Sequence, residues 1–111
     1  GTIMIGTYAG AAAGNLYRHD PIAQSTMLIA SYAGAVFSVT QDRLSGDWYV
    51  ETRAAPKLYR LAEDGSPLAL PSNIPSSPAG DGVLQYSPDH RLFRLIGDAN
   101  SAAGLEIYTL P

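Results

Sequence analysis

A chain of 111 residues with 46% hydrophobic and only 15% charged residues is neither intrinsically disordered nor a coiled coil, and it is expected to bury a core. Its net charge is −3 and its seven basic residues are scattered rather than clustered, so a nucleic-acid-binding surface is not expected. The absence of cysteine excludes disulfides and thiolate zinc sites, and the longest nearly uncharged stretch, 22–40, is too polar to span a bilayer.

Short apolar runs separated by turn residues predict an all-β chain built from antiparallel strands. The first two runs flank a loop rich in Gly and Ala, as the strands of a β-hairpin do. Two further runs lie around Tyr32-Ala33-Gly34, and the order then repeats. The expected strands span 2–7, 15–18, 26–30, 35–39, 47–52, 57–61, 67–70, 82–86, 93–98 and 105–110.

One of these runs returns at a spacing of about 45 residues, at 2–7, 47–52 and 93–98. That spacing is typical of β-propeller blades, in which each repeat is a four-stranded sheet. If the strands of a blade are lettered A to D from the inner strand outward, the chain reads C-D, A-B-C-D, A-B-C-D. The expectation is a single all-β domain, 1–111, with repeat units of roughly 1–22, 23–65 and 66–111.

A closed propeller needs about four blades or more, so this chain cannot close a ring alone. Three interpretations stay open at this point. The chain is a piece of a longer protein, or copies of it associate to complete the ring, or it is a small β-sandwich or β-barrel in which the repeat has no structural meaning. Two copies would supply about twenty strands, enough for five four-stranded blades.

The segment Ser87-Pro88-Asp89-His90 resembles the Ser-Pro-Asp-Gly turn of WD40-like and sugar-lactonase-like propeller blades. In such a turn Pro88 presets φ and Asp89 accepts backbone N–H bonds. His90 stands where the family usually has glycine, so a left-handed conformation there would be strained. The runs 15–18 and 57–60, both containing Leu-Tyr-Arg, similarly resemble outer-strand runs of lactonase-type propellers.

A competing resemblance lies at Gly46-Asp47-Trp48, which is similar to the Gly-x-Trp signature of lipocalins and related ligand-binding barrels. That resemblance implies a barrel with the tryptophan at its base. In lipocalins, however, the motif comes near the N-terminus, whereas only about 60 residues follow Trp48 here. The alternative interpretation is that Trp48 is a core aromatic of a blade.

Residues for catalysis are few, and no catalytic residue is assigned. His19-Asp20 could act as an acid-base pair only if a nucleophile faced it, and His19 and His90 lack the spacing of metal ligands. The lactonase resemblance implies a divalent metal held by Glu, Asn and Asp side chains. Residues of those types are Glu51, Asn73, Asp98 and Asn100, but none matches a family motif. No metal or other cofactor is therefore predicted, except under the lactonase alternative.

Aromatic side chains are the better candidates for a binding site. Tyr and Trp are amphipathic and lose little entropy when they are ordered at an interface, so they suit contacts with sugars or proteins. We single out Tyr8, Tyr32, Trp48 and Tyr49 as binding candidates, against the simpler interpretation that Tyr is a good strand former.

The sequence thus favours a noncatalytic β-module that binds a protein or a glycan and could assemble with copies of itself. Three alternatives stay open: a metal-dependent hydrolase of the sugar-lactonase kind or a fragment of one, a structural subunit of a viral or filament assembly, and a lipocalin-like barrel for a small ligand. The low-charge composition rich in Ala, Gly, Ser, Thr and Tyr leans toward an extracellular or periplasmic setting.

Overall fold

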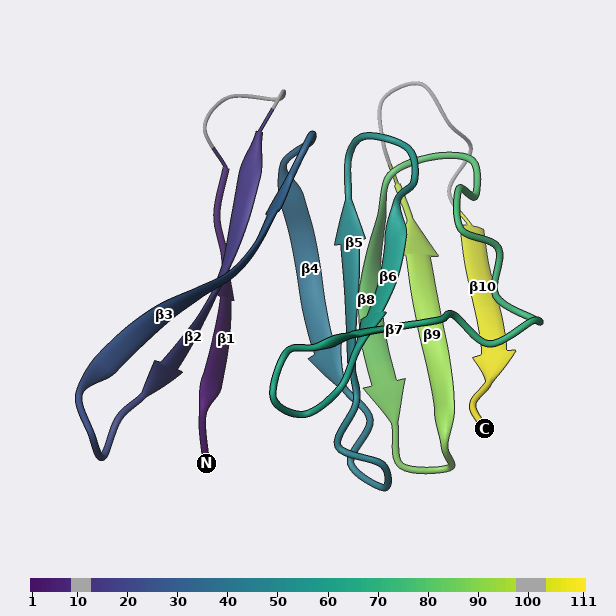
Figure 1. Cartoon of the computed structure of the whole chain (residues 1–111). Coiled ribbons are helices and arrows are strands. Elements are labelled where there is room, and N and C mark those ends of the chain that lie inside the picture. Colours follow the sequence, from purple (N-terminus) through teal and green to yellow (C-terminus); the bar gives the residue numbers. More distant parts are fainter. Residues whose placement is uncertain (9–12, 98–103) are drawn as a thin grey trace.

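The computed structural model of the chain describes residues 1–8, 13–97 and 104–111, and these form an all-β domain without helices (Figure 1). Every run expected to be a strand overlaps one, with ends that differ by a few residues, so the all-β prediction is confirmed. None of the described residues belongs to a helix long and apolar enough to cross a membrane. The strands are β1 (Ile3–Gly6), β2 (Gly14–Asp20), β3 (Ser25–Tyr32), β4 (Val36–Gln41), β5 (Trp48–Thr52), β6 (Leu58–Leu61), β7 (Pro67–Leu68), β8 (Gly82–Ser87), β9 (Arg91–Ile96) and β10 (Gly104–Thr109).

The strands form three antiparallel sheets (Figure 1). The N-terminal sheet has the order β1-β2-β3, the middle sheet β4-β5-β6-β7 and the C-terminal sheet β10-β9-β8. The hairpins expected from the repeat are all present, since β1 pairs with β2, β5 with β6 and β9 with β10. The ladders of the described residues do not join these sheets into one closed barrel, whereas a small β-sandwich is compatible with them.

The sheets group the strands differently from the predicted repeat units. Strand β3 pairs with β2 and β7 pairs with β6, although the predicted units place each of these strands at the start of the next blade. Local turns explain the difference. The Asp20 carboxylate accepts hydrogen bonds from the backbone of Ile22 and Ala23, which tightens the β2–β3 turn. Gly65, with a φ of 96°, allows the short β6–β7 turn.

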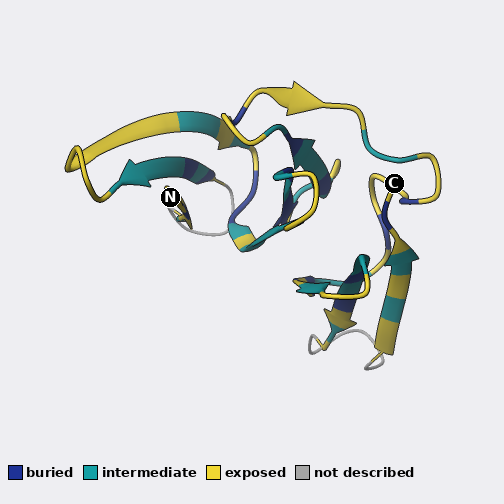
Figure 2. Ribbon diagram, turned by 90° about the horizontal axis from the view of Figure 1, so that it is seen from below, coloured by how far each residue is buried: buried dark blue, intermediate teal, exposed yellow. Residues whose placement is uncertain are grey.

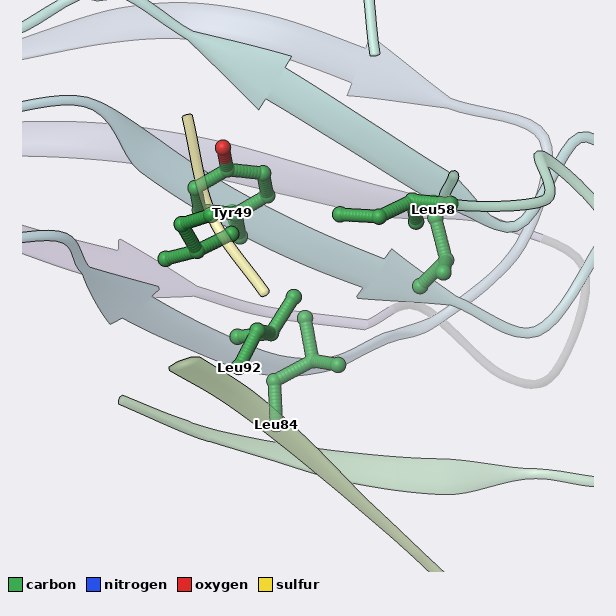
Figure 3. Packing of buried hydrophobic residues seen from close by; sticks show 6 residues of the cluster. Tyr49, Leu58, Leu84 and Leu92 are labelled. Carbon is green, nitrogen blue, oxygen red and sulfur yellow. The ribbon is translucent and has the colours of Figure 1, made fainter. Parts of the chain in front are cut away.

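One hydrophobic cluster lies between the middle and C-terminal sheets. Figure 3 shows Tyr49 and Leu58 of the middle sheet facing Leu84 and Leu92 of the C-terminal sheet. The connector between β7 and β8 contributes Ile74 to the same cluster. This connector is rich in proline, which favours extended backbone, yet it makes a turn from residue 71 to 74 that places the Ile74 side chain in the core.

A second cluster lies between the N-terminal and middle sheets and contains Met4, Leu16, Val50 and Leu61. Successive side chains of a strand point to opposite faces of its sheet. Tyr49 therefore packs toward the C-terminal sheet, while the next residue, Val50, packs toward the N-terminal sheet. The middle sheet is covered on both faces, which explains why four of the five residues of β5 are buried.

Candidate functional site

A groove of about 830 Å³ opens where the first strands of the three sheets come together. Strand β4 lies against both β1 and β8, so each sheet contributes to the lining. The lining residues are Thr2, Ile3, Met4, Val39, Thr40, Gln41, Arg43, Leu44, Trp48, Gln85, Tyr86 and Pro88. The groove is therefore shared among all three sheets, and two of its lining residues, Trp48 and Pro88, come from the sequence motifs described above.

The groove combines aromatic rings with amide and hydroxyl groups. Several of these polar groups already have backbone partners: the Thr40 hydroxyl accepts a hydrogen bond from the Tyr86 N–H at 3.1 Å, and the Gln41 amide donates to the Gly46 carbonyl at 3.1 Å. The indole Nε1 of Trp48 is buried without a hydrogen-bond partner among the described residues. Aromatic rings beside amide and hydroxyl groups whose positions are fixed by hydrogen bonds suit a ring-shaped polar ligand such as a sugar.

The four aromatic binding candidates do not come together on one surface. Trp48 borders the groove, whereas Tyr8 is largely exposed beside the segment 9–12, which lies outside the described residues. Tyr32 packs against the ring of Tyr59, with centroids 4.7 Å apart. Tyr49 is only 2% exposed, so its ring is not accessible to a ligand or partner. The sequence could not reveal this, because the face of a strand that becomes covered depends on which sheet packs against it.

Burial also affects the hydroxyl groups of Tyr32 and Tyr49. It raises the pKa of each to about 12. Neither hydroxyl has a hydrogen-bond partner within the described part of the chain. These two side chains therefore remain protonated at neutral pH and contribute mainly to packing.

Glu51, one of the four residues of the types that hold the metal in lactonase-type propellers, forms an ion pair in this structure. Its two carboxylate oxygens accept hydrogen bonds from Arg94 at 2.8 and 3.0 Å, and one also accepts from the Gly82 N–H at 2.7 Å. Asn73 donates to the Thr109 carbonyl. Asp98 and Asn100 lie outside the described residues. In the described ranges, no three His, Asp or Glu side chains are grouped so that they could hold a metal ion.

The histidine of the His19-Asp20 pair is engaged within the N-terminal sheet. Its Nδ1 lies 2.9 Å from the Thr26 hydroxyl across the β2–β3 ladder. Asp20 instead accepts the backbone hydrogen bonds of the following turn, led by that of Ala23, and these bonds lower the pKa of its carboxyl. The pair therefore stabilises a hairpin in this structure.

Arg94 is the centre of a buried polar network that sequence analysis missed. Its side chain is 0% exposed, and besides Glu51 it donates to Glu106 and to the carbonyls of Ala79 and Gly80. Burial opposes its charge, but the hydrogen bonds to Glu51 and Glu106 raise its pKa. The signal in the sequence was an arginine between the apolar residues Phe93 and Leu95, but its partner Glu51 is 43 positions away.

Asp42 and His90 link the hairpin turns of the middle and C-terminal sheets. The Asp42 carboxylate is 1% exposed, accepts the backbone N–H bonds of Leu44 and Ser45 with one oxygen, and lies 2.8 Å from His90 Nε2 with the other. His90 has a φ of 64°, so it adopts the left-handed conformation that is strained for a residue other than glycine. A strained residue is thus retained where its side chain reaches the neighbouring sheet.

Both outermost sheets present apolar side chains to solvent, and we call these surfaces the C-terminal face and the N-terminal face. Leu95, at 51% exposure, lies between Val83 and Leu105 across the ladder. Strand β10 alternates exposed and half-buried positions (Figure 2). The C-terminal face consists of Val83, Gln85, Phe93, Leu95, Leu105 and Ile107. The N-terminal face consists of Ile3, Ile5, Tyr17 and Leu28, with the polar residues His19 and Thr26 in line with Ile3.

Comparison with known proteins does not assign the chain to a family. No protein-family model matches it, and a search of curated proteins finds no relative. The resemblances to propeller blades and to lipocalins therefore stay predictions.

The buried ion pair can be tested with two matched substitutions in one strand. Arg94→Gln should lower the free energy of unfolding by about 3 kcal/mol or more, because it leaves Glu51 charged and buried. Arg91→Gln breaks an exposed ion pair with Asp89 and should cost less than about 1 kcal/mol. Urea denaturation measures both. Equal losses for the two variants would contradict the role given to Arg94.

The Asp42 carboxylate should make stability depend on pH. Burial alone would raise its pKa, but hydrogen bonds from His90, Leu44 and Ser45 outweigh that effect and keep the pKa below the usual 3.8. A depressed folded-state pKa stabilises the protein above the unfolded-state pKa, and this stabilisation is lost as the pH falls through the folded-state pKa. The stability difference between wild type and Asp42→Asn, measured by urea denaturation, should therefore be largest near neutral pH and shrink in acid. A difference independent of pH would disprove this.

Proposed function

We propose that the chain is a noncatalytic β-module that binds a protein partner through the apolar outer faces of its N-terminal and C-terminal sheets. The observation that supports this most directly is the exposure of Leu95, Leu105 and Ile107 on one face and of Ile3 and Ile5 on the other. An antiparallel sheet with one solvated side alternates apolar and polar residues. These two sheets instead carry apolar residues on both sides, as the covered middle sheet does.

Clustering of the exposed side chains supports the same proposal. Isolated apolar residues on a protein surface need no explanation, whereas contiguous apolar patches mark interaction sites. Val83, Leu95 and Leu105 form one continuous cross-strand row, and Ile5, Tyr17 and Leu28 form another. Continuous rows of this kind are what a second sheet packs against.

We further propose that the three sheets are a section of a propeller-like stack. The sheets lie side by side with the middle sheet between the other two (Figure 1). Strands β4 and β8 adjoin the shared groove, as inner strands adjoin the central channel of a propeller, and β1, which the repeat makes equivalent to β5 and β9, borders the groove beside them. The middle sheet has four strands and the outer sheets have three each. In this proposal the chain supplies one complete blade and two blades that each lack one strand.

Binding of a glycan in the groove is a second candidate, supported by the presence of Trp48 and Tyr86 beside Gln41, Gln85 and Thr40. These residues offer stacking surfaces and polar groups of the kind used by sugar sites.

The glycan hypothesis can be tested through the intrinsic fluorescence of Trp48, the only tryptophan in the chain. Titration with neutral oligosaccharides should change its emission with saturation, because the ligand would displace water beside the indole. Tyr86→Ala should weaken binding at least about fivefold if its ring contributes the roughly 1 kcal/mol typical of aromatic contacts. Tyr8→Ala serves as the matched control outside the groove. Unchanged emission across the titration would rule out this candidate.

The main proposal is tested by affinity capture with three immobilised forms of the chain. Leu95→Lys combined with Leu105→Lys places charges on the C-terminal face, whereas Ile22→Lys makes the same kind of change at an exposed apolar residue in the β2–β3 turn, off both faces. A partner from an extract of the source cells should be retained by wild type and by Ile22→Lys but lost with the face variant. It is then identified by mass spectrometry and bound again in pure form. If no protein depends on this face, and none is lost from a fourth form in which Ile3→Glu and Ile5→Glu place charges on the N-terminal face, the proposal fails.

A further inference from the structure

We infer that the partner of the C-terminal face is the N-terminal face of a second copy of this chain, so that copies associate head to tail. This inference rests on the proposed function and names the partner. It depends on how the internal repeat places equivalent residues relative to the interfaces between sheets.

Met4, Tyr49 and Leu95 occupy the same position in the recurring strand at 2–7, 47–52 and 93–98. Each points toward the next sheet along the chain. Met4 packs against the middle sheet and Tyr49 against the C-terminal sheet, so both are buried. Leu95 has the same orientation, but the chain provides no further sheet within its described residues, and the side chain is 51% exposed. The C-terminal face is thus the uncovered counterpart of two buried faces.

The opposite end of the stack shows the complementary pattern. Ile5 and Val50 are equivalent in the same repeat, and Val50 points back toward the N-terminal sheet, where it is fully buried. Ile5 points away from the middle sheet and is 42% exposed. The chain therefore has one uncovered face of the type that contains Met4 and one of the type that contains Val50. These are the two types that meet between the N-terminal and middle sheets, so a second copy continues an interface that the fold already forms.

The size of the faces favours a closed pair of copies over a single contact. Three strands spaced by about 4.8 Å, with about six residues rising 3.4 Å each, give a face of roughly 300 Å². One contact between two such faces covers roughly 600 Å², which is below the about 1,200 Å² of stable interfaces. When two copies each use both faces, the total reaches roughly 1,200 Å². The contact is heterologous, because it joins two different faces. The pair is closed when the second copy in turn places its C-terminal face against the N-terminal face of the first.

The test exchanges charges between the two faces. One variant carries Leu95→Lys and Leu105→Lys on the C-terminal face, and the other carries Ile3→Glu and Ile5→Glu on the N-terminal face. Two copies of the same variant would place charged side chains against an apolar face at both of their contacts. Mixed, the lysines of one variant meet the glutamates of the other, and the remaining contact joins two unaltered faces.

Light scattering gives the mass in solution, and native mass spectrometry gives the composition of the mixture. Wild type and the Ile22→Lys control are expected at twice the chain mass of 11.7 kDa, each charged variant alone at 11.7 kDa, and the mixture as a one-to-one heterodimer. Circular dichroism and thermal unfolding verify that the variants are folded. If the lysine double variant does not fold, the single substitution Ile107→Lys on the C-terminal face replaces it. If the glutamate double variant does not fold, the single substitution Ile5→Glu on the N-terminal face replaces it.

Two results would overturn the inference. A wild-type chain that stays at 11.7 kDa at every concentration tested has no second copy as partner. A glutamate variant that still dimerises alone uses two C-terminal faces against each other, which is a different interface. A monomeric wild type that captures another protein through these faces would leave the proposed function in place, whereas a monomer that captures none would remove both proposals.

Discussion

The middle sheet has another sheet on each of its faces, and most other features of the structure depend on that position. A strand there cannot alternate apolar and polar residues, because both of its sides are buried. Strand β5 meets this requirement with Tyr49 and Val50 but also places Glu51 in the interior. A buried carboxylate is tolerated only when it is paired and hydrogen-bonded. Arg94 of the adjacent sheet provides the pairing, and its further bonds to the carbonyls of Ala79 and Gly80 also hold the connector before β8 in place.

The positions of the strands could be predicted from the sequence because alternating side chains and turn residues are local signals. The strand over 26–30 was placed correctly, but its sheet was not evident, because pairing with β2 depends on the turn stabilised by Asp20. Burial was harder to predict still. Tyr49 and Leu95 are both apolar residues on a recurring strand, yet one is in the core and the other is half exposed. The difference is the presence of a neighbouring sheet, which no single strand encodes.

Two long-range contacts could not be predicted from the sequence for a related reason. One joins Asp42 to His90, and the other joins Glu51 to Arg94. Each joins residues more than 40 positions apart, 48 in the first case and 43 in the second. Nothing in either local sequence identifies the partner. Local rules did identify His90 as a position where a left-handed backbone would be strained, and its φ is 64°. A side chain that departs from the backbone preference of its turn is a reasonable place to expect a long-range contact.

The groove and the N-terminal face are not independent surfaces, because Ile3 belongs to both. A second sheet packed on Ile3 and Ile5 would cover part of the groove rim, and a ligand in the groove would contact a residue of the proposed interface. By thermodynamic linkage, if association changes the affinity for a groove ligand, the ligand must change the strength of association by the same factor. Fluorescence of Trp48, which also lines the groove, would therefore respond to association as well as to a ligand. A sugar titration can be assigned to direct binding only when the mass of the protein is measured at the same concentration and does not change.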